Sequence, residues 1–250
     1  MLRDLSSGQQ TAIHASSVAL LIGGGLVSRQ PRNRQIDRSY RPSRLDLFMR
    51  NLMPGRRDTV TNFIDSNVGG AGMPAAALLA VSIIDIERQE FSRDVTFYLS
   101  GLAATNGITA IIKTIAKRPR PYCLPGGRPP PELPLEAPDH HRSFVSGHAS
   151  MAFYGAAFFN LRFRRAMRLD WTRDEYRVGR WASPILSFGC ASFVGLSRIH
   201  ADKHYFTDVL AGAILGTALA ELYYWLAYDT IDARDSAVPN GLHLSIRFSL

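Results

Sequence analysis

Long apolar stretches, separated by shorter polar segments, dominate the pattern of this chain. They cover Pro74–Ile86, Val95–Lys117, Gly147–Phe163, Pro184–Ile199 and Thr207–Tyr228. A shorter apolar run, Ala15–Val27, is consistent with a signal peptide, a first helix of the fold or a membrane-associated helix. Buried strands have about 4–8 residues, and these stretches, rich in Ala, Leu, Phe and Gly, are longer. The pattern therefore predicts an all-α fold, built as a single helical bundle.

Polar, proline-containing segments connect these predicted helices. Residues Arg29–Arg57 predict a polar connection, and the many prolines of Pro119–His141 predict a loop, because proline cannot continue a regular helix. We therefore expect an N-terminal apolar helix and an Arg-rich connection over 1–60, a helical core over 61–230 and a C-terminal tail over 231–250. The end of the tail alternates apolar and polar residues, which predicts a short strand or an extended arm.

The apolar stretches leave the relation to a membrane open. A spanning helix needs about 20 predominantly apolar residues. Thr207–Tyr228 nearly qualifies but contains Glu221, and Val95–Lys117 is long enough but contains polar residues. The mean hydropathy of the chain is −0.05, which is low for a protein made mostly of spanning helices. The sequence thus favours a bundle that is soluble or rests on a membrane over an integral membrane protein.

The charge balance indicates an anionic partner. Lys and Arg number 29 against 21 Asp and Glu, giving a net charge of +8. Nucleic acid, anionic lipid and phosphorylated substrates all suit such a balance. The densest basic stretch, Arg29–Arg57, has few aromatic side chains to stack on bases, so we expect no nucleic-acid partner. Two cysteines, Cys123 and Cys190, make no disulfide framework, and a single bridge between them stays open.

Three short polar motifs lie in the second half of the chain. They are Lys113 with Arg120-Pro121, then Ser146-Gly147-His148, then Ser197-Arg198 followed by His204 and Asp208. Ser146 precedes an apolar helical run and is predicted to cap it, which leaves the amides of Gly147 and His148 without helical acceptors. Free amides and the helix dipole together form an anion site. The side chains of Lys113, Arg120 and Arg198 add positive charge, and arginine grips phosphate oxygens with paired hydrogen bonds.

The two histidines of these motifs supply the groups that phosphoryl transfer needs. His204 and Asp208 are four residues apart, so on a helix the carboxylate can accept a proton from one imidazole nitrogen. That contact fixes the tautomer and leaves the other nitrogen as a nucleophile. His148 lies on a different segment and can protonate the leaving oxygen. The motifs therefore predict an active site formed between helices, with a nucleophile, an acid and a phosphate cradle.

These motifs resemble those of the type 2 phosphatidic acid phosphatase superfamily, which also includes the vanadium haloperoxidases. The family pattern is Lys, six residues, Arg-Pro; then Pro-Ser-Gly-His; then Ser-Arg, five residues, His, three residues, Asp. This chain matches it from Lys113 to Asp208, except that Val145 replaces the proline of the second motif. That residue shapes a turn and handles no proton. The first hundred residues carry no motif of the family.

The resemblance implies a metal-independent phosphatase without a cofactor. It implies a phosphohistidine on His204, oriented by Asp208, with His148 as acid and then as base. The phosphate oxygens would be held by Lys113, Arg120, Ser146, Gly147 and Arg198. The implied substrate is a phosphoric monoester, most consistent with a lipid phosphate such as phosphatidate or a prenyl (di)phosphate, and the implied location is the cell envelope, membrane-associated or periplasmic. An anionic membrane surface is a further expected partner.

Three other functions fit parts of the sequence. A soluble acid phosphatase of broad specificity would use the same site residues. A vanadium haloperoxidase would hold vanadate, a phosphate analogue, in the same cradle, but this chain is short for the larger peroxidases. A non-catalytic protein that binds anionic membranes would not need His204 and Asp208 at this spacing, or a second histidine on another segment.

Overall fold

A computed structural model of the chain describes residues 5–29, 40–53, 67–85, 91–125, 127, 137–170 and 172–228. Within these residues lie the α-helices α1 (Ser7–Arg29), α2 (Arg44–Leu52), α4 (Asn67–Asp85), α5 (Phe91–Ala116), α6 (Gly147–Asp170), α7 (Arg173–His200) and α8 (Phe206–Tyr228). Two 3-10 turns, η1 (Pro121–Cys123) and η2 (Pro138–His141), follow α5. The described part of the chain contains no strand, which confirms the predicted all-α fold. The tail predicted over 231–250 lies outside the described residues.

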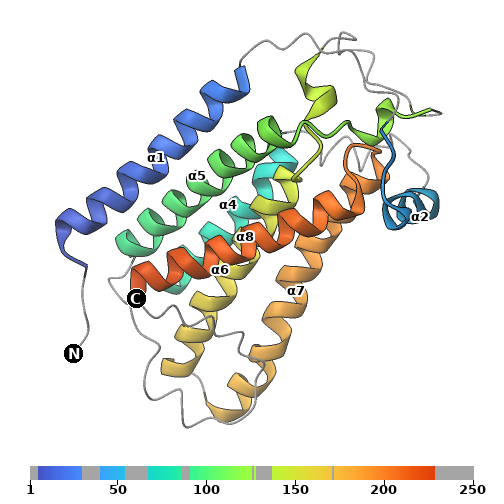
Figure 1. The fold of residues 1–250 in the computed structure, drawn as a ribbon. Helices are drawn as coiled ribbons and strands as arrows, with labels where there is room; N and C mark the ends of the chain where they lie inside the picture. The colour runs from blue at the N-terminus through green and yellow to red at the C-terminus, as the bar shows by residue number, and fades with distance from the viewer. Residues whose placement is uncertain are drawn as a thin grey trace.

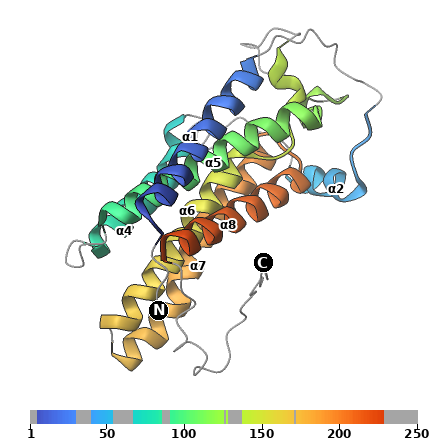
Figure 2. The same cartoon turned by 60° about the vertical axis from the view of Figure 1, so that its left-hand side comes forward.

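The long helices run alternately up and down and pack around α6 (Figures 1 and 2). Helix α6 contacts α4, α5, α7 and α8, and α1 packs along the outer side of α5. With this topology, the C-terminal ends of α5 and α7 meet the N-terminal ends of α6 and α8 at one end of the bundle (Figure 1). The short helix α2 lies at the same end. All three polar motifs of the sequence are therefore carried to one place.

Two helices begin earlier than the sequence indicated. The predicted helices began near Pro74 and Pro184, where the apolar stretches start, but both prolines lie inside α4 and α7. Helix α7 begins at a capping box instead, in which the Thr172 hydroxyl accepts from the Glu175 amide and the Glu175 carboxylate accepts from the Thr172 amide. The cap supplies acceptors for the unpaired amides at the helix start, eleven or twelve residues before Pro184.

The prediction that Arg29–Arg57 forms only a polar connection was wrong, because this segment contains α2. Ser43 caps the helix by accepting from the amide of Asp46 at 3.1 Å. A helix this short is marginal by itself, and its stability depends on tertiary contacts. Polar side chains help to hold it: Asp46 accepts from the Thr207 amide at the start of α8, and Arg50 donates to Asp202 just after α7. Hydrophobic periodicity does not detect such contacts.

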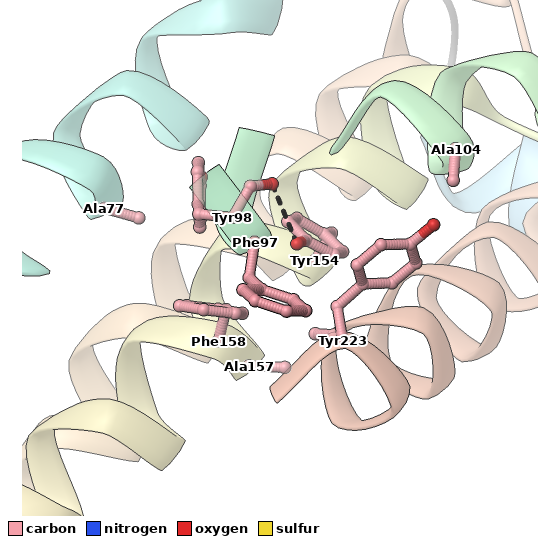
Figure 3. Close-up of a cluster of buried hydrophobic side chains, with 9 residues drawn as sticks. Ala77, Phe97, Tyr98, Ala104, Tyr154, Ala157, Phe158 and Tyr223 are labelled. Carbon is pink, nitrogen blue, oxygen red and sulfur yellow. Dashed lines mark hydrogen bonds between the residues drawn. The ribbon is translucent and has the colours of Figure 1, made fainter. Parts of the chain in front are cut away.

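The centre of the bundle is an aromatic core between α4, α5, α6 and α8 (Figure 3). Tyr98, Tyr154 and Phe158 are fully buried there. The Tyr154 hydroxyl donates to the Tyr98 carbonyl oxygen at 2.9 Å, and the Tyr98 hydroxyl donates to the Pro74 carbonyl oxygen at 2.6 Å. These hydrogen bonds replace the water that the two hydroxyls lose on burial, so both tyrosine rings can fill the core.

Within the described part of the chain, four helical segments are long and apolar enough to cross a membrane, namely Ser7–Ser28, Phe91–Cys123, Asp174–His200 and Phe206–Tyr228. Large apolar side chains point out of the bundle along them, with Ile22 57%, Ile185 68% and Ile214 62% exposed. Exposed apolar surface on this scale is typical of contact with lipid. The protein is therefore a membrane protein, and our preference for a soluble or surface-resting bundle was wrong. Cys123 and Cys190, whose pairing the sequence left open, are both free.

Glycines bring α8 into close contact with α6. A Cβ atom added at Gly212 would lie 2.6 Å from the Ser146 carbonyl oxygen, and one at Gly216 would overlap the Ser150 carbonyl oxygen. The spacing of these glycines resembles that of small residues where membrane helices meet. The contact presses the start of α8, which carries Asp208, against the start of α6, which carries Ser146. Close packing here therefore positions the site.

We expect Gly216→Ala to lower the melting temperature of the detergent-solubilised protein by about 3–10 °C, because the added methyl group must push two backbones apart. Gly189→Ala is the matched control, since Gly189 lies on α7 with nothing within 4 Å of an added Cβ atom. That variant should melt at the wild-type temperature or slightly above it. Equal melting temperatures for the two variants would contradict the close contact.

Candidate active site

All eight residues that the sequence proposed for the site lie at the end of the bundle where α5, α6, α7 and α8 meet. Lys113 is in the last turn of α5 and Arg120 follows it; Ser146 and Gly147 begin α6. The charges of Lys113, Arg120, Arg198 and His148 all act on His204. The Nη1 atom of Arg120 is 3.4 Å from Nε2 of His204. Tertiary structure thus assembles the three motifs into one site.

The tautomer of His204 follows from its contacts. Its ring is buried, and Nδ1 lies 2.7 Å from the carbonyl oxygen of Ser143. A carbonyl oxygen only accepts, so Nδ1 carries the proton and Nε2 keeps its lone pair. Nε2 is the nitrogen that faces Arg120. His204 therefore presents an unprotonated nitrogen to the positively charged side of the site.

Asp208 does not hold His204 in the way that we predicted. Its Oδ2 atom is 3.7 Å from Nδ1 of His204, too far for a hydrogen bond. The reason is that His204 precedes α8, which begins at Phe206, so the two residues do not share one turn of helix. Oδ2 of Asp208 accepts instead from the Ser143 hydroxyl at 2.5 Å and from the Tyr205 amide at 2.9 Å. Asp208 thus orients His204 through Ser143, which bridges them.

Arg118 is a half-buried link that the motifs did not reveal. Its Nη1 donates to Oδ1 of Asp208 at 2.5 Å, and its Nη2 donates to Oδ2 of Asp46, on α2, at 2.7 Å. The guanidinium also lies over the Tyr205 ring, 4.2 Å from its centroid. Arg118 therefore neutralises two buried carboxylates and ties α2 to the start of α8. It falls among the six variable residues of the first motif, so the motif gives no signal for it.

The guanidinium of Arg120 is held by the proline-rich segment. Its Nε donates to the Asp139 carbonyl oxygen at 2.9 Å, and its Nη2 donates to Oδ1 of Asp139 at 2.7 Å. Nη1 donates to the Lys203 carbonyl oxygen at 3.1 Å and faces His204. Asp139 therefore aims one edge of Arg120 at the nucleophile. This role was not predicted, because one aspartate in a long proline-rich loop has no distinctive spacing.

The start of α6 has the predicted arrangement. The helix begins at Gly147, and the Ser146 hydroxyl accepts from the amide of Ala149 at 3.4 Å. The amides of the first turn lack partners within the helix and can bind an anion. A Cβ atom added at Gly147 would lie 3.6 Å from Nζ of Lys113, so the open side of this glycine faces the lysine. An anion at the helix start would therefore meet both the amides of Gly147 and His148 and the Lys113 ammonium.

The electrostatics of the site keep His204 neutral. Burial lowers the pKa of His204 well below its ordinary value, and the positive charges of Arg120, Lys113 and Arg198 lower the pKa further. Burial raises the pKa of Asp139, but its contact with Arg120 and the nearby Lys113 and His204 side chains together bring that pKa below its usual value. Among the described residues, no group of three or more His, Cys, Asp or Glu side chains could hold a metal ion. Lys113, Arg120 and Arg198 each place a positive charge near His204.

Comparison with curated proteins finds relatives that are named as lipid phosphatases. Lipid phosphate phosphatase 1 of Arabidopsis thaliana is 32% identical over 142 residues, which are 50% of this chain and 42% of that protein. Lipid phosphate phosphatase 2 of the same plant is 29% identical over 209 residues, 70% of this chain and 71% of that protein. The chain spans less than half the length of the first curated relatives that it matches.

A solved structure and a family model also match the chain. The transmembrane PAP2 type phosphatidylglycerolphosphate phosphatase from Bacillus subtilis superposes with a TM-score of 0.51 at 18% identity, covering 92% of this chain and 90% of that chain, and this likeness concerns the fold. The model of the PAP2 superfamily matches residues 94–232, more than half of the chain, and this stretch contains every residue of the three motifs. The chain therefore belongs to the PAP2 superfamily.

Proposed function

We propose that this protein is a phosphatase that hydrolyses a lipid phosphate monoester through a phosphohistidine on His204. The observation that carries the proposal is the neutral, buried His204, with Nε2 unprotonated and directed at the cations of the site. A lone pair in that position can attack phosphorus, while the cations and the amides of α6 stabilise the charge on the other phosphate oxygens.

The reaction has two displacement steps. In the first, Nε2 of His204 attacks phosphorus, the bond from phosphorus to the leaving oxygen breaks, and His148 gives that oxygen its proton. In the second, neutral His148 takes a proton from water, the water oxygen attacks phosphorus, and the bond from phosphorus to Nε2 breaks to release inorganic phosphate. The imidazole ring becomes positive in the intermediate. The Asp208 carboxylate, 3.7 Å from Nδ1, and the Ser143 carbonyl stabilise that charge.

Two observations support a lipid substrate and a location in a membrane of the cell envelope. The curated relatives are named for lipid phosphates. The site also lies at one end of helices that are long enough to span a bilayer, and the phosphate of a membrane lipid lies at the bilayer surface. Metal independence is part of the proposal, because Lys113, Arg120 and Arg198 supply the positive charge that phosphoryl transfer requires. Vanadate should occupy the same cradle as a phosphate analogue.

The direct test is phosphate release by the purified protein in EDTA, measured with phosphatidate in mixed micelles and with p-nitrophenyl phosphate. We expect release from both substrates, a preference for phosphatidate in kcat/KM, and inhibition by vanadate. The proposal would be overturned if folded protein released phosphate from neither substrate. It would also be overturned if activity appeared only after a divalent metal was added.

The pH profile of kcat/KM should be bell-shaped, with its acid limb at a lower pH than an ordinary histidine would give. His204 must be neutral to attack, and the pKa of His204 is lowered from 6.5 because the ring is buried among cations. The nucleophile therefore stays active at pH values where an ordinary histidine is mostly protonated, and its acid limb should lie below pH 6.5. The basic limb reflects loss of the His148 proton.

The profile should be measured with two substrates, because phosphate monoesters themselves titrate near pH 6. Two esters whose phosphates have different pKa values will shift the part of the profile that reflects substrate ionisation. The part that reflects His204 will stay at the same pH. An acid limb of the enzyme at or above 6.5, or a profile flat from about pH 4 to 9, would contradict the assignment of His204.

A further inference from the structure

Two charged side chains of helix α2, Asp46 and Arg50, face the protein. The carboxylate of Asp46, 1% exposed, accepts from the Thr207 amide at 2.9 Å and from Arg118 at 2.7 Å. Arg50, one turn later, makes two hydrogen bonds to the Asp202 carboxylate, at 2.7 and 2.8 Å. These buried and half-buried ion pairs fix the rotation of α2 about its axis, because turning the helix would leave the charges without partners.

The opposite side of α2 is an exposed apolar stripe, formed by Leu45, Phe48 and Leu52. Their side chains are 48%, 58% and 60% exposed. They are spaced three and four residues apart and so share one face of the helix. A surface helix of a soluble protein has the reverse arrangement, with its apolar face on the core and its polar face in water. The inverted arrangement indicates that the stripe meets an apolar medium outside the protein.

The surroundings of α2 identify that medium as lipid. The helix packs against α7 and α8, at the end of the bundle that carries the site (Figure 2). Both of these helices contain segments that can span a membrane, and they expose apolar side chains such as Phe193 and Leu210. The exposed Arg44 lies beside the stripe, where it can reach anionic headgroups. The apolar surface of α2 thus continues the lipid-facing surface of the bundle.

We propose that α2 is an interfacial helix, whose stripe of Leu45, Phe48 and Leu52 inserts into the boundary between headgroups and acyl chains of the bilayer. Asp46 and Arg118 join this helix to Asp208, so its depth in the bilayer sets the depth of the His204 site. The helix thereby holds the site at the level of lipid phosphates and favours them over soluble phosphate esters. This kinetic consequence rests on the proposed phosphatase function, whereas the insertion of α2 does not.

Insertion is tested by fluorescence quenching in vesicles. In the whole chain, Trp171, Trp181 and Trp225 are replaced by Phe, and Phe48→Trp then supplies the single tryptophan. This protein is reconstituted into vesicles whose lipids carry bromine near the top of the acyl chains. We expect strong quenching by these lipids and weak quenching by aqueous acrylamide. Leu47→Trp in the same background is the matched control, because Leu47 is also exposed, at 40%, but lies outside the stripe. It should be quenched more by acrylamide. Acrylamide quenching of Phe48→Trp equal to the control would overturn the proposal.

The effect on selectivity is tested with the triple variant Leu45→Asn, Phe48→Asn and Leu52→Asn. We expect kcat/KM for phosphatidate in vesicles to fall about tenfold, with unchanged hydrolysis of p-nitrophenyl phosphate and an unchanged melting temperature, since the replaced side chains make the lipid-facing stripe. Leu47→Asn should change neither rate. A proportional loss on both substrates would overturn the role in selectivity. Wild-type protein inactive on both substrates, with Phe48→Trp still quenched by lipid, would instead reject the phosphatase function and leave the interfacial helix standing.

Discussion

His204→Asn is expected to lose phosphate release from phosphatidate and p-nitrophenyl phosphate by at least about 10⁴-fold, because the variant lacks the Nε2 lone pair proposed to attack phosphorus. The asparagine amide can still donate to the Ser143 carbonyl oxygen, so the loop before α8 should keep its conformation. The loss should appear in kcat, and labelled substrate should leave no label on the protein. In the wild type, rapid quenching in alkali should trap a phosphorylated protein whose label is released by acid, as a phosphorus–nitrogen bond requires.

His14→Asn is the matched control for this prediction. His14 lies on α1, where Nδ1 is 2.7 Å from the Ser100 hydroxyl, and it takes no part in the site. Its substitution should leave kcat within about twofold of the wild-type value. Phosphate release by His204→Asn at more than about a hundredth of the wild-type rate would remove His204 from the nucleophile's role, since a residual rate of that size needs another attacking group.

His148→Asn is expected to reduce kcat by about 10²–10⁴-fold for an alkyl phosphate such as phosphatidate. The reason is that an alkoxide leaves slowly unless a proton reaches its oxygen as the bond breaks. p-Nitrophenolate is a stable anion and leaves without that proton, so phosphorylation of His204 by p-nitrophenyl phosphate should slow far less. The variant should release a burst of p-nitrophenol and then turn over slowly, because His148 also activates the water of the second step.

The comparison of the two substrates separates an acid from a binding residue. If His148 only bound the phosphate, both substrates would lose the same factor, and no burst would appear. Equal losses would therefore contradict the assignment of His148 as the acid. Inhibition of the variant by vanadate at the wild-type concentration serves as the control for an intact cradle, because Lys113, Arg120 and Arg198 remain in place.

Much of the fold was predictable because helices in this chain are apolar along their length. The stretches ending near Lys117 and Tyr228 and the one beginning at Gly147 correspond to α5, α8 and α6. Chemistry was predictable where spacing is fixed by local geometry, as in Ser146, which caps α6. Membrane spanning was underestimated, because the polar loops and the site residues lower the mean hydropathy of the whole chain.

The sequence by itself determined the helical class, the three motifs and the identity of the two histidines, since each depends on residue types at short separations. Only the tertiary structure decided how His204 is held. Ser143 intervenes between His204 and Asp208, and Arg118 links Asp208 to Asp46 on a helix that the pattern did not reveal. These partners are brought together by the packing of distant segments, whose pairing leaves no local periodicity. Side-chain contacts across the bundle, rather than the spacing of the motifs, therefore set the geometry of the site.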